Sequence, residues 1–247
     1  MIVTASDGVQ LRGYSIHRPE ARGTVVLVHG WGPNLATLDA DAGISLSRGL
    51  TWRGWIYGAW GRRRYPLDVG FSEVGDLRSL FSHLRAEGRL PRPVVLSGIS
   101  LGATIALLAA AEEPEVVGVI ADSPFNRLEE AVDHYAARSL PIMPKYPMRW
   151  LTLRLVELQV GRRLSSLSVE SVLPKLAPRP ILLMHCEGDS LVLCRNSDQI
   201  AAAYPEHTEY WRIPGGDHLS ARWQDPDEWE RRVDAFLERV APALRAP

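Results

Sequence analysis

The apolar positions of this 247-residue chain form short continuous runs separated by longer stretches of mixed polarity. The most apolar runs are rich in valine, isoleucine and leucine and lie at residues 24–29, 93–97, 116–121 and 180–185. Continuous runs of this kind are typical of strands buried on both faces of a parallel sheet. Weaker runs predict additional strands at residues 2–4, 9–17, 55–59 and 209–213.

The stretches between these runs carry apolar residues at helical spacing. The clearest of them is residues 72–87, in which Leu77, Leu80 and Leu84 share one face. Ser72 precedes this face, and its hydroxyl makes it the expected N-cap. Further helices are expected at residues 37–51, 103–112, 195–204 and 225–240. Strands that alternate with helices predict an α/β fold, with a mostly parallel central sheet covered by helices on both faces.

A long interval separates the last two strongly apolar runs. It comprises residues 122–179, far more than a simple crossover between parallel strands needs. Its helical patches, near 126–139, 148–160 and 169–176, are broken by Pro141, Pro144 and Pro147. We therefore expect a small helical cap inserted at residues 124–175. The core of the fold is then divided between residues 1–123 and 176–247.

Composition and charge narrow the class of protein. The chain is 46% hydrophobic and 23% charged, so a sizeable core is expected rather than disorder. Its net charge of −1, from 28 basic and 29 acidic residues, gives no reason to expect nucleic acid or an anionic membrane as partner. The sequence has no signal-peptide pattern at its N-terminus and no long apolar segment. We expect a cytoplasmic protein.

The cysteine and histidine patterns do not resemble a metal site. Cys186 and Cys194 are the two cysteines, and we expect free thiols, with a single bond between them as the alternative. Neither C-x-x-C nor H-E-x-x-H occurs in the chain. We therefore expect no metal and no cofactor.

Residues 98–102 are the most specific chemical signal in the chain. They read Gly-Ile-Ser-Leu-Gly and join a predicted strand to a helix of small residues. In this setting G-x-S-x-G forms a nucleophile elbow, a tight turn that holds the Ser100 hydroxyl at the carboxyl end of the sheet. The two flanking glycines allow the helix to start close to the strand. The helix N-terminus also favours negative charge beside the serine.

An acid and a histidine follow Ser100 along the chain, each in a loop after a predicted strand. They are Asp189 and His218. Because the carboxyl ends of parallel strands meet at one edge of a sheet, we expect the three side chains to lie together there. His218 would take the proton of Ser100 and return it to the leaving group, while Asp189 would orient the imidazole.

The oxyanion formed when an acyl carbonyl is attacked needs backbone N–H donors. We expect these from Leu101, directly after the nucleophile, and from Trp31, in the loop after the strand at 24–29. His29 and His185 each end a buried strand, and we expect both to be structural. Asp217, beside His218, is expected to face away or to fix the loop.

With this constellation the chain resembles the α/β-hydrolase superfamily over nearly its whole length, and within it the bacterial serine aminopeptidase-like and monoacylglycerol lipase-like branch. The matching landmarks are Asp7-Gly8, residues 29–32 (His-Gly-Trp-Gly), the elbow, residues 121–125 (Ala-Asp-Ser-Pro-Phe), Gly188-Asp189 and residues 216–218 (Gly-Asp-His). The resemblance implies a serine hydrolase of carboxylic esters with a variable cap. Some members of the fold take their acid from the strand after the elbow, which makes Asp122 the alternative to Asp189.

The chain departs from the family pattern in places. Residues 57–64 read Tyr-Gly-Ala-Trp-Gly-Arg-Arg-Arg where Asp-x-Arg-Gly-x-Gly-x-Ser is common, so the substrate class stays open. His185-Cys186 replaces the usual His-Gly, and Ala103 stands where a second glycine is common. Peptidase, amidase, thioesterase or acyltransferase activity and a non-catalytic binding module are the alternatives. The apolar cap residues either line an acyl pocket or pack within the cap; they are Leu140, Ile142, Met143, Tyr146, Met148 and Trp150.

Overall fold

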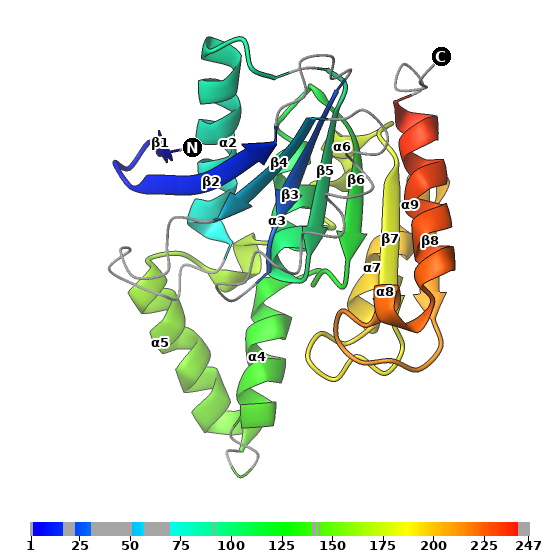
Figure 1. Cartoon of the computed structure of the whole chain (residues 1–247). Helices are drawn as coiled ribbons and strands as arrows, with labels where there is room; N and C mark the ends of the chain where they lie inside the picture. Colours follow the sequence, from blue (N-terminus) through cyan, green and yellow to red (C-terminus); the bar gives the residue numbers. More distant parts are fainter. Residues whose placement is uncertain are drawn as a thin grey trace.

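The computed structural model describes residues 2–16, 23–30, 51–56, 70–90, 92–139, 142 and 144–241. Within these residues, eight strands form one sheet in the order β1-β2-β4-β3-β5-β6-β7-β8 (Figure 1). They are β1 (Ile2–Thr4), β2 (Gln10–Ile16), β3 (Thr24–Val28), β4 (Thr51–Ile56), β5 (Val94–Ile99), β6 (Val116–Asp122), β7 (Ile181–Cys186) and β8 (Thr208–Ile213). β2 pairs antiparallel with β1 and β4, and all other pairs are parallel. The α/β fold with a mostly parallel sheet is therefore confirmed.

Both faces of the parallel strands are apolar, which explains the continuous runs in the sequence. In β3, Val26 and Val28 belong to one buried cluster, whereas Val25 and Leu27 belong to another on the opposite face. β7 alternates in the same way. Successive side chains of a strand point to opposite faces, so a strand between two layers of helices needs an apolar residue at every position.

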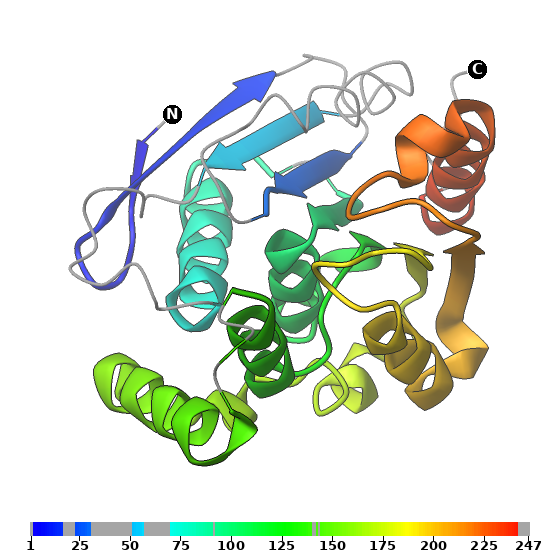
Figure 2. The same cartoon turned by 90° about the horizontal axis from the view of Figure 1, so that it is seen from below.

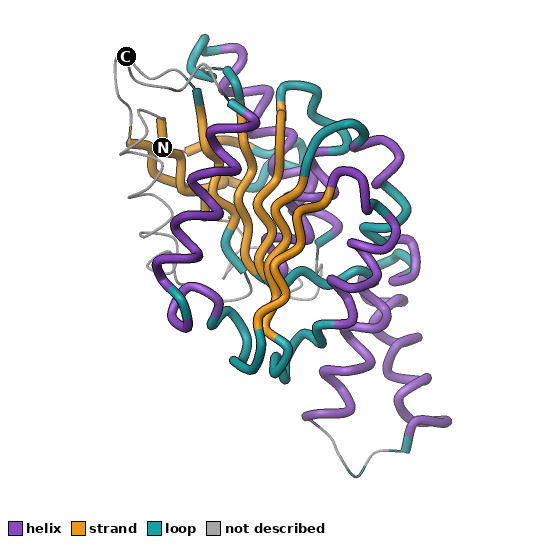
Figure 3. The backbone as a smooth tube through the Cα atoms, turned by 90° about the vertical axis from the view of Figure 1, so that its right-hand side faces the viewer, coloured by secondary structure: helices purple, strands orange, loops and turns teal. Residues whose placement is uncertain are grey.

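Helices cover both faces of the sheet (Figure 2). One layer contains α2 (Phe71–Ala86), α3 (Leu101–Ala110), α6 (Leu173–Leu176) and α7 (Arg195–Ala203). The opposite layer contains α8 (Ala221–Gln224) and α9 (Pro226–Val240). Figure 3 shows the twisted sheet between them, with helices on either side. A short 3₁₀ turn, η4 (Pro205–His207), leads from α7 into β8.

α9 illustrates why these segments form helices against the sheet. Its buried stripe consists of Trp229, Val233, Phe236 and Leu237. These positions recur at helical spacing, so they lie on one side of the helix and pack on the sheet. At the N-terminus the Asp225 carboxylate accepts a hydrogen bond from the N–H of Glu228 at 3.1 Å. Pro226 occupies the first turn, where its missing N–H removes no helical hydrogen bond.

Two helices extend beyond the carboxyl ends of the parallel strands (Figures 1 and 3). They are α4 (Leu128–Ser139) and α5 (Trp150–Val160), and a π-helical turn, η2 (Lys145–Arg149), precedes α5. A β-bridge between Arg127 and Ser168 joins the chain that enters α4 to the chain that returns from α5. After the turn η3 (Leu164–Ser166), Leu167 packs in the same cluster as the sheet. The cap boundaries at residues 124 and 175 stay a prediction.

The start of β4 differs from the prediction. The helix expected at 37–51 falls outside the described residues up to position 50, and Thr51 begins a strand. β4 pairs with β3 from Thr51 opposite Thr24 onward, and with β2 from Trp52 onward. The hydrogen bonds to two neighbouring strands thus place the strand ahead of the predicted range of 55–59.

Two helices also begin elsewhere than predicted. The N-cap of α2 is Gly70 and not Ser72, because the N–H of Gly70 donates to the Glu73 carboxylate at 2.9 Å and the helix then begins at Phe71. The helix expected at 169–176 is shorter, since α6 comprises Leu173–Leu176 alone.

Candidate active site

Ser100 lies in a tight turn between β5 and α3. Its backbone has φ 54° and ψ −124°, a conformation that residues other than glycine rarely adopt. The turn is held on both sides: the N–H of Ser100 donates to the Asp122 carbonyl at 2.8 Å, and the Ser100 carbonyl accepts from the N–H of Ala103 at 3.0 Å. Strained backbone of this kind persists only where the surrounding structure holds it in place, and it is concentrated at functional sites. Ser100 thus lies in a sharp strand-to-helix turn at the position where the sequence predicted one.

The elbow requires glycine because α3 lies directly against the sheet. A Cβ atom on Gly102 would overlap the carbonyl oxygens of Val28 and His29 at the end of β3. A Cβ atom on Gly98 would likewise overlap the backbone of Gly102. Any side chain at either position would push α3 away from the strands, and Ser100 would move with it.

The structure brings Ser100, His218 and Asp189 together. The Nε2 atom of His218 lies 2.9 Å from the Ser100 Oγ, and its Nδ1 atom lies 2.7 Å from the Oδ2 of Asp189. An ionised carboxylate only accepts hydrogen bonds, so Nδ1 carries the proton and donates it to Asp189. Nε2 is then the acceptor for the Ser100 hydroxyl. This tautomer is the one that a general base beside a serine needs.

Two loops, after β7 and after β8, supply Asp189 and His218 and are joined to each other. The N–H of Gly188 donates to the Gly215 carbonyl at 3.0 Å. Gly188 approaches so closely that a Cβ atom there would overlap the Gly216 carbonyl oxygen. The Asp217 carboxylate accepts from the N–H groups of Ser190 at 3.0 Å and His218 at 2.8 Å. Asp217 thus fixes the two loops together, as one of its two predicted roles requires.

The carboxylate of Asp189 is buried but well supplied with donors. Its Oδ1 atom accepts from the backbone N–H groups of Leu191 at 2.9 Å and Val192 at 2.8 Å. Burial acts to raise the pKa of Asp189, but the hydrogen bonds from His185, His218 and Val192 outweigh it and hold the pKa well below its ordinary value. Asp189 is therefore a carboxylate throughout the physiological pH range.

Asp122, the alternative acid, lies one strand away at the end of β6. Its carboxylate accepts from the Ser123 hydroxyl at 2.9 Å. Burial raises its pKa to about 6, although that hydrogen bond and the nearby His185 and His218 act in the other direction. Since Asp189 holds the 2.7 Å contact with His218, the geometry favours Asp189 as the partner of the histidine.

Of the two expected oxyanion donors, only Leu101 lies within the described residues. Leu101 is the first residue of α3, where backbone N–H groups have no helical partner. Trp31 lies outside the described residues. The loop that leads to it passes the elbow, because a Cβ atom on Gly30 would lie 3.1 Å from the Cβ of Ser100. His29, beside it, is buried, its pKa is lowered chiefly by that burial, and its Nδ1 contacts the Gly30 carbonyl oxygen.

The remaining chemical candidates do not form a second centre in the described part of the chain. Cys186 and Cys194 are buried free thiols, and burial raises the pKa of Cys186 to about 11, which makes it unreactive. The described residues contain no cluster of three or more histidine, cysteine or acidic side chains able to hold a metal. None of the described helices has the length and apolar character needed to cross a bilayer.

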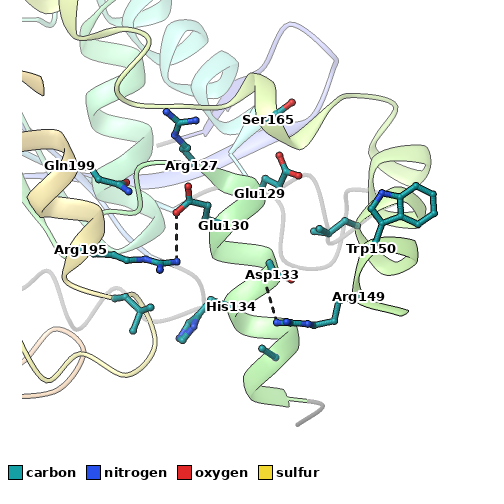
Figure 4. Close-up of a pocket in the computed structure, with 13 residues that line it drawn as sticks. Arg127, Glu129, Glu130, Asp133, His134, Arg149, Trp150, Ser165, Arg195 and Gln199 are labelled. Carbon is teal, nitrogen blue, oxygen red and sulfur yellow. Dashed lines mark hydrogen bonds and ion pairs between the residues drawn. The ribbon is translucent and has the colours of Figure 1, made fainter. Parts of the chain in front are cut away.

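A groove of about 900 Å³ runs between α4, α5 and α7 (Figure 4). Its opposite charges pair with each other: Asp133 lies 3.4 Å from Arg149, and Glu130 lies 3.7 Å from Arg195. Trp150, one of the apolar cap residues, lines this groove and is half-exposed. The groove thus lies between the projecting helices and α7, and the described residues that line it do not include the candidate active-site residues.

Of the other apolar cap residues, Ile142 and Met148 are described and are not among the side chains that line that groove. Met148 and Ile142 are exposed, Ile142 almost completely. Leu140, Met143 and the side chain of Tyr146 lie outside the described residues.

The comparisons with known proteins agree with this architecture. The sequence profile of the Alpha/beta hydrolase family matches residues 25–232, and the chain belongs to that family. None of the curated proteins matches the chain significantly in sequence.

Many solved structures share the fold, at low sequence identity. An esterase of Pyrococcus furiosus, Pf2001, superposes with a TM-score of 0.77 at 21% identity, over 97% of this chain and 89% of that one. The esterase domain of a Rhodothermus marinus protein gives 0.69 at 19% identity, over 97% of each chain. Est1E from Butyrivibrio proteoclasticus gives 0.71 at 19% identity, over 98% of each chain. At these identities the likeness establishes the fold.

Proposed function

We propose that this chain is a serine hydrolase that cleaves carboxylic esters of small molecules through an acyl-enzyme intermediate. The observation that carries the proposal is the pair of contacts from His218, 2.9 Å to the Ser100 hydroxyl and 2.7 Å to the Asp189 carboxylate. A serine made nucleophilic by a histidine, itself oriented by an acid, is the arrangement that acyl transfer requires.

In the acylation step, His218 Nε2 accepts the proton of Ser100 as Oγ bonds to the acyl carbon. The carbonyl oxygen becomes an oxyanion, for which the N–H of Leu101 and, as the second donor, the N–H of Trp31 are proposed. Asp189 stabilises the imidazolium formed on His218. The ester bond then breaks, and Nε2–H protonates the alkoxide, which leaves as an alcohol.

In the deacylation step, a water molecule takes the place of the alcohol. His218 Nε2 accepts its proton as the oxygen attacks the acyl carbon of the ester on Ser100. When the second oxyanion collapses, the bond to Ser100 Oγ breaks and the proton returns to it from His218. A carboxylic acid is released and the resting site is restored.

One further observation supports an ester as the substrate. Several of the solved structures with this fold are named as esterases or carboxylesterases. The helices α4 and α5 extend past the edge of the sheet where Ser100 lies, and we propose residues 124–175 as a cap that limits access of water and of large substrates. The chemistry proposed is the same for amides and thioesters, so those activities are outcomes of the test.

The test is covalent labelling followed by kinetics. A fluorophosphonate probe is expected to add to Ser100, located by mass spectrometry, and Ser100→Ala is expected to abolish labelling. The same substitution is expected to lower kcat by about 10⁴ to 10⁶ on the best nitrophenyl ester. A panel of nitrophenyl esters beside an aminopeptidase substrate assigns the class. A folded wild-type protein that the probe does not label would reject the hydrolase and favour a binding module.

A further inference from the structure

A second histidine contacts the carboxylate of Asp189. The Nε2 atom of His185, the residue before the last of β7, lies 3.2 Å from Asp189 Oδ2 and 2.8 Å from the Val192 carbonyl oxygen. On the other side of the ring, Nδ1 lies 2.7 Å from the hydroxyl of Ser197 in α7. His185 and Ser197 are 0% exposed, so water does not compete for these contacts.

The partners of His185 define its tautomer. A backbone carbonyl only accepts hydrogen bonds, so the 2.8 Å contact with Val192 requires the proton to be on Nε2. The same N–H is shared with Asp189 Oδ2. In the neutral ring Nδ1 then has no proton and accepts from the Ser197 hydroxyl. Ser197 therefore fixes the ring so that its N–H faces the Val192 carbonyl, with Nε2 3.2 Å from the Asp189 carboxylate.

We propose that His185, held by Ser197, is a positioning residue that fixes the orientation of Asp189 and sets how strongly it binds His218. The effect on turnover rests on the hydrolase function proposed above. The effect on the binding of His218 by Asp189 is a property of the resting protein and does not depend on it.

The distribution of donors around Asp189 explains both parts of this role. Oδ1 accepts from the N–H groups of Leu191 and Val192, and Oδ2 accepts from His218 and His185. Two donors on each oxygen prevent rotation of the carboxylate, so Oδ2 stays aligned with His218. Because His185 and His218 share one oxygen, each draws on the same negative charge. Loss of the His185 donor leaves more charge on Oδ2 for the imidazolium of His218.

A purely space-filling role explains this arrangement poorly. Burying a polar ring costs free energy unless its nitrogen atoms are hydrogen-bonded, and an apolar side chain would fill the volume without that cost. Here both ring nitrogens are satisfied, and one of them contacts the charged group of the site. The spacing of His185 and Asp189, four residues apart across the end of β7, was visible in the sequence. Their contact depends on the fold of the loop after the strand.

Other charged and titratable groups surround the Asp189–His218 pair and form a constant background in the test. Asp122 approaches from β6, Cys186 lies on β7, and Asp217 lies in the loop after β8. From α4, His134 and Arg138 contact the carbonyl oxygen of Ser190, next to Asp189. None of these is changed in the His185 and Ser197 variants.

The experiment compares His185→Phe, which removes the donor and keeps a ring, with His185→Gln, which keeps an N–H donor. Ring-proton NMR of His218 in the resting protein is the first readout. We expect His185→Phe to move the titration midpoint of His218 upward by about half to one pH unit, the equivalent of one hydrogen bond. His185→Gln is expected to leave it near the wild-type position.

Turnover is the second readout. On the best nitrophenyl ester, His185→Phe is expected to lower kcat about tenfold to a hundredfold with little change in KM, because the residue does not face the substrate. The acid limb of kcat/KM is expected to move to higher pH with the NMR midpoint. Ser197→Ala, a milder change, is expected to shift both in the same direction by a smaller amount.

An unmoved His218 midpoint in folded His185→Phe and Ser197→Ala, with activity lost only in proportion to a lowered Tm, would overturn the proposal. Should His185→Phe fail to fold, Ser197→Ala still decides the question through the same midpoint. A wild-type protein that hydrolyses no ester would reject the hydrolase function, whereas the NMR comparison would still test the role of His185.

Discussion

At the scale of single residues, two buried carboxyl groups on neighbouring strands show how local contacts determine their chemistry. Asp122 ends β6 and Asp189 follows β7, and the two strands pair side by side. Asp189 accepts hydrogen bonds from two backbone N–H groups and two histidines, and its pKa is held low. Asp122 accepts one from Ser123, and burial raises its pKa to about 6. Asp189 thus stays ionised over the whole physiological pH range, whereas Asp122 becomes protonated as the pH falls through about 6.

The assignment of the acid is tested by a pair of matched substitutions. Asp189→Asn is expected to lower kcat by about 10⁴, since the neutral amide no longer stabilises the correct tautomer or the imidazolium of His218. Asp122→Asn is expected to have a far smaller effect. Steady-state kinetics on one ester measures both. Equal losses, or a larger loss at Asp122, would contradict the assignment.

Asp122 also gives the stability of the fold a predictable pH dependence. Its pKa rises from 3.8 to about 6 on folding, so the folded state favours the protonated form. The stabilisation from this proton is full below pH 3.8 and disappears as the pH rises through about 6. The difference between these pKa values corresponds to about 3 kcal/mol. The side chain of Asp122→Asn is always neutral. Its free energy of unfolding relative to wild type is therefore expected to rise by about 3 kcal/mol between pH 4 and pH 8.

Urea denaturation at several pH values measures this gain. Asp217→Asn is the control with the opposite trend, because the N–H groups of Ser190 and His218 hold the pKa of Asp217 below its ordinary value. Its carboxylate stabilises the fold at pH values above the ordinary pKa of an aspartate, and this stabilisation is lost as the pH falls below that pKa. If the relative stability of Asp122→Asn is independent of pH, its carboxyl group is not buried as described.

At the scale of elements, the elbow depends on how closely α3 approaches β3. The helix begins at Leu101, and Gly102 lies against the carbonyl oxygens at the end of β3. The contact between α3 and the end of β3 therefore positions both Ser100, the proposed nucleophile, and the N–H of Leu101, the proposed oxyanion donor. Shifting α3 by the radius of one methyl group would displace both Ser100 and the N–H of Leu101.

Gly102→Ala is accordingly expected to destabilise the fold by about 1 to 3 kcal/mol through overpacking, and to lower activity further than the loss of folded protein explains. Gly75→Ala is the matched control. Gly75 lies inside α2 with open space where a Cβ would be placed, so alanine there is expected to add about 0.5 to 1 kcal/mol of stability. Thermal unfolding and ester kinetics on both variants check this. A Gly102→Ala protein as stable as wild type would show that α3 has room to move.

At the scale of the whole molecule, one sheet separates two apolar cores. α2, α3, α6 and α7 pack on one face, and α8 and α9 pack on the other. All three candidate active-site residues lie at the carboxyl edge of this sheet, at the ends of β5, β7 and β8. Because the parallel strands end together, groups far apart in the sequence reach within hydrogen-bonding distance of each other.

A substitution at Phe236 tests how much α9 contributes to the apolar core between the sheet and the layer of α8 and α9. The side chain is fully buried and fits against Gly118 of β6. Phe236→Ala is expected to destabilise the protein by about 3 to 5 kcal/mol, through lost burial and the cavity that remains. Leu158→Ala, at a position 79% exposed on α5, is the control and is expected to change stability by less than about 0.5 kcal/mol. Comparable losses in both variants would mean that α5 is packed more tightly than described.

Much of this architecture could be predicted from the sequence because its signals are local. The apolar runs predicted β3, β5, β6 and β7, since a strand covered on both sides is apolar throughout. The elbow was readable because its sharp turn needs glycine two residues before and after Ser100. The order of Ser100, Asp189 and His218 predicted their meeting, because each follows a parallel strand.

Other features depended on contacts between segments distant in the sequence, which no local pattern encodes. β4 begins at Thr51 because it pairs with β3 from that residue and with β2 from Trp52. The contrast between Asp189 and Asp122 arises from the donors that the folded loops bring to each carboxylate. The contact of His185 with Asp189 and Ser197 formed only when β7, its loop and α7 packed together. The sequence by itself thus determined the strands, the elbow and the set of reactive residues, whereas the tertiary structure decided the surroundings of each, because hydrogen bonds and burial depend on distance in space.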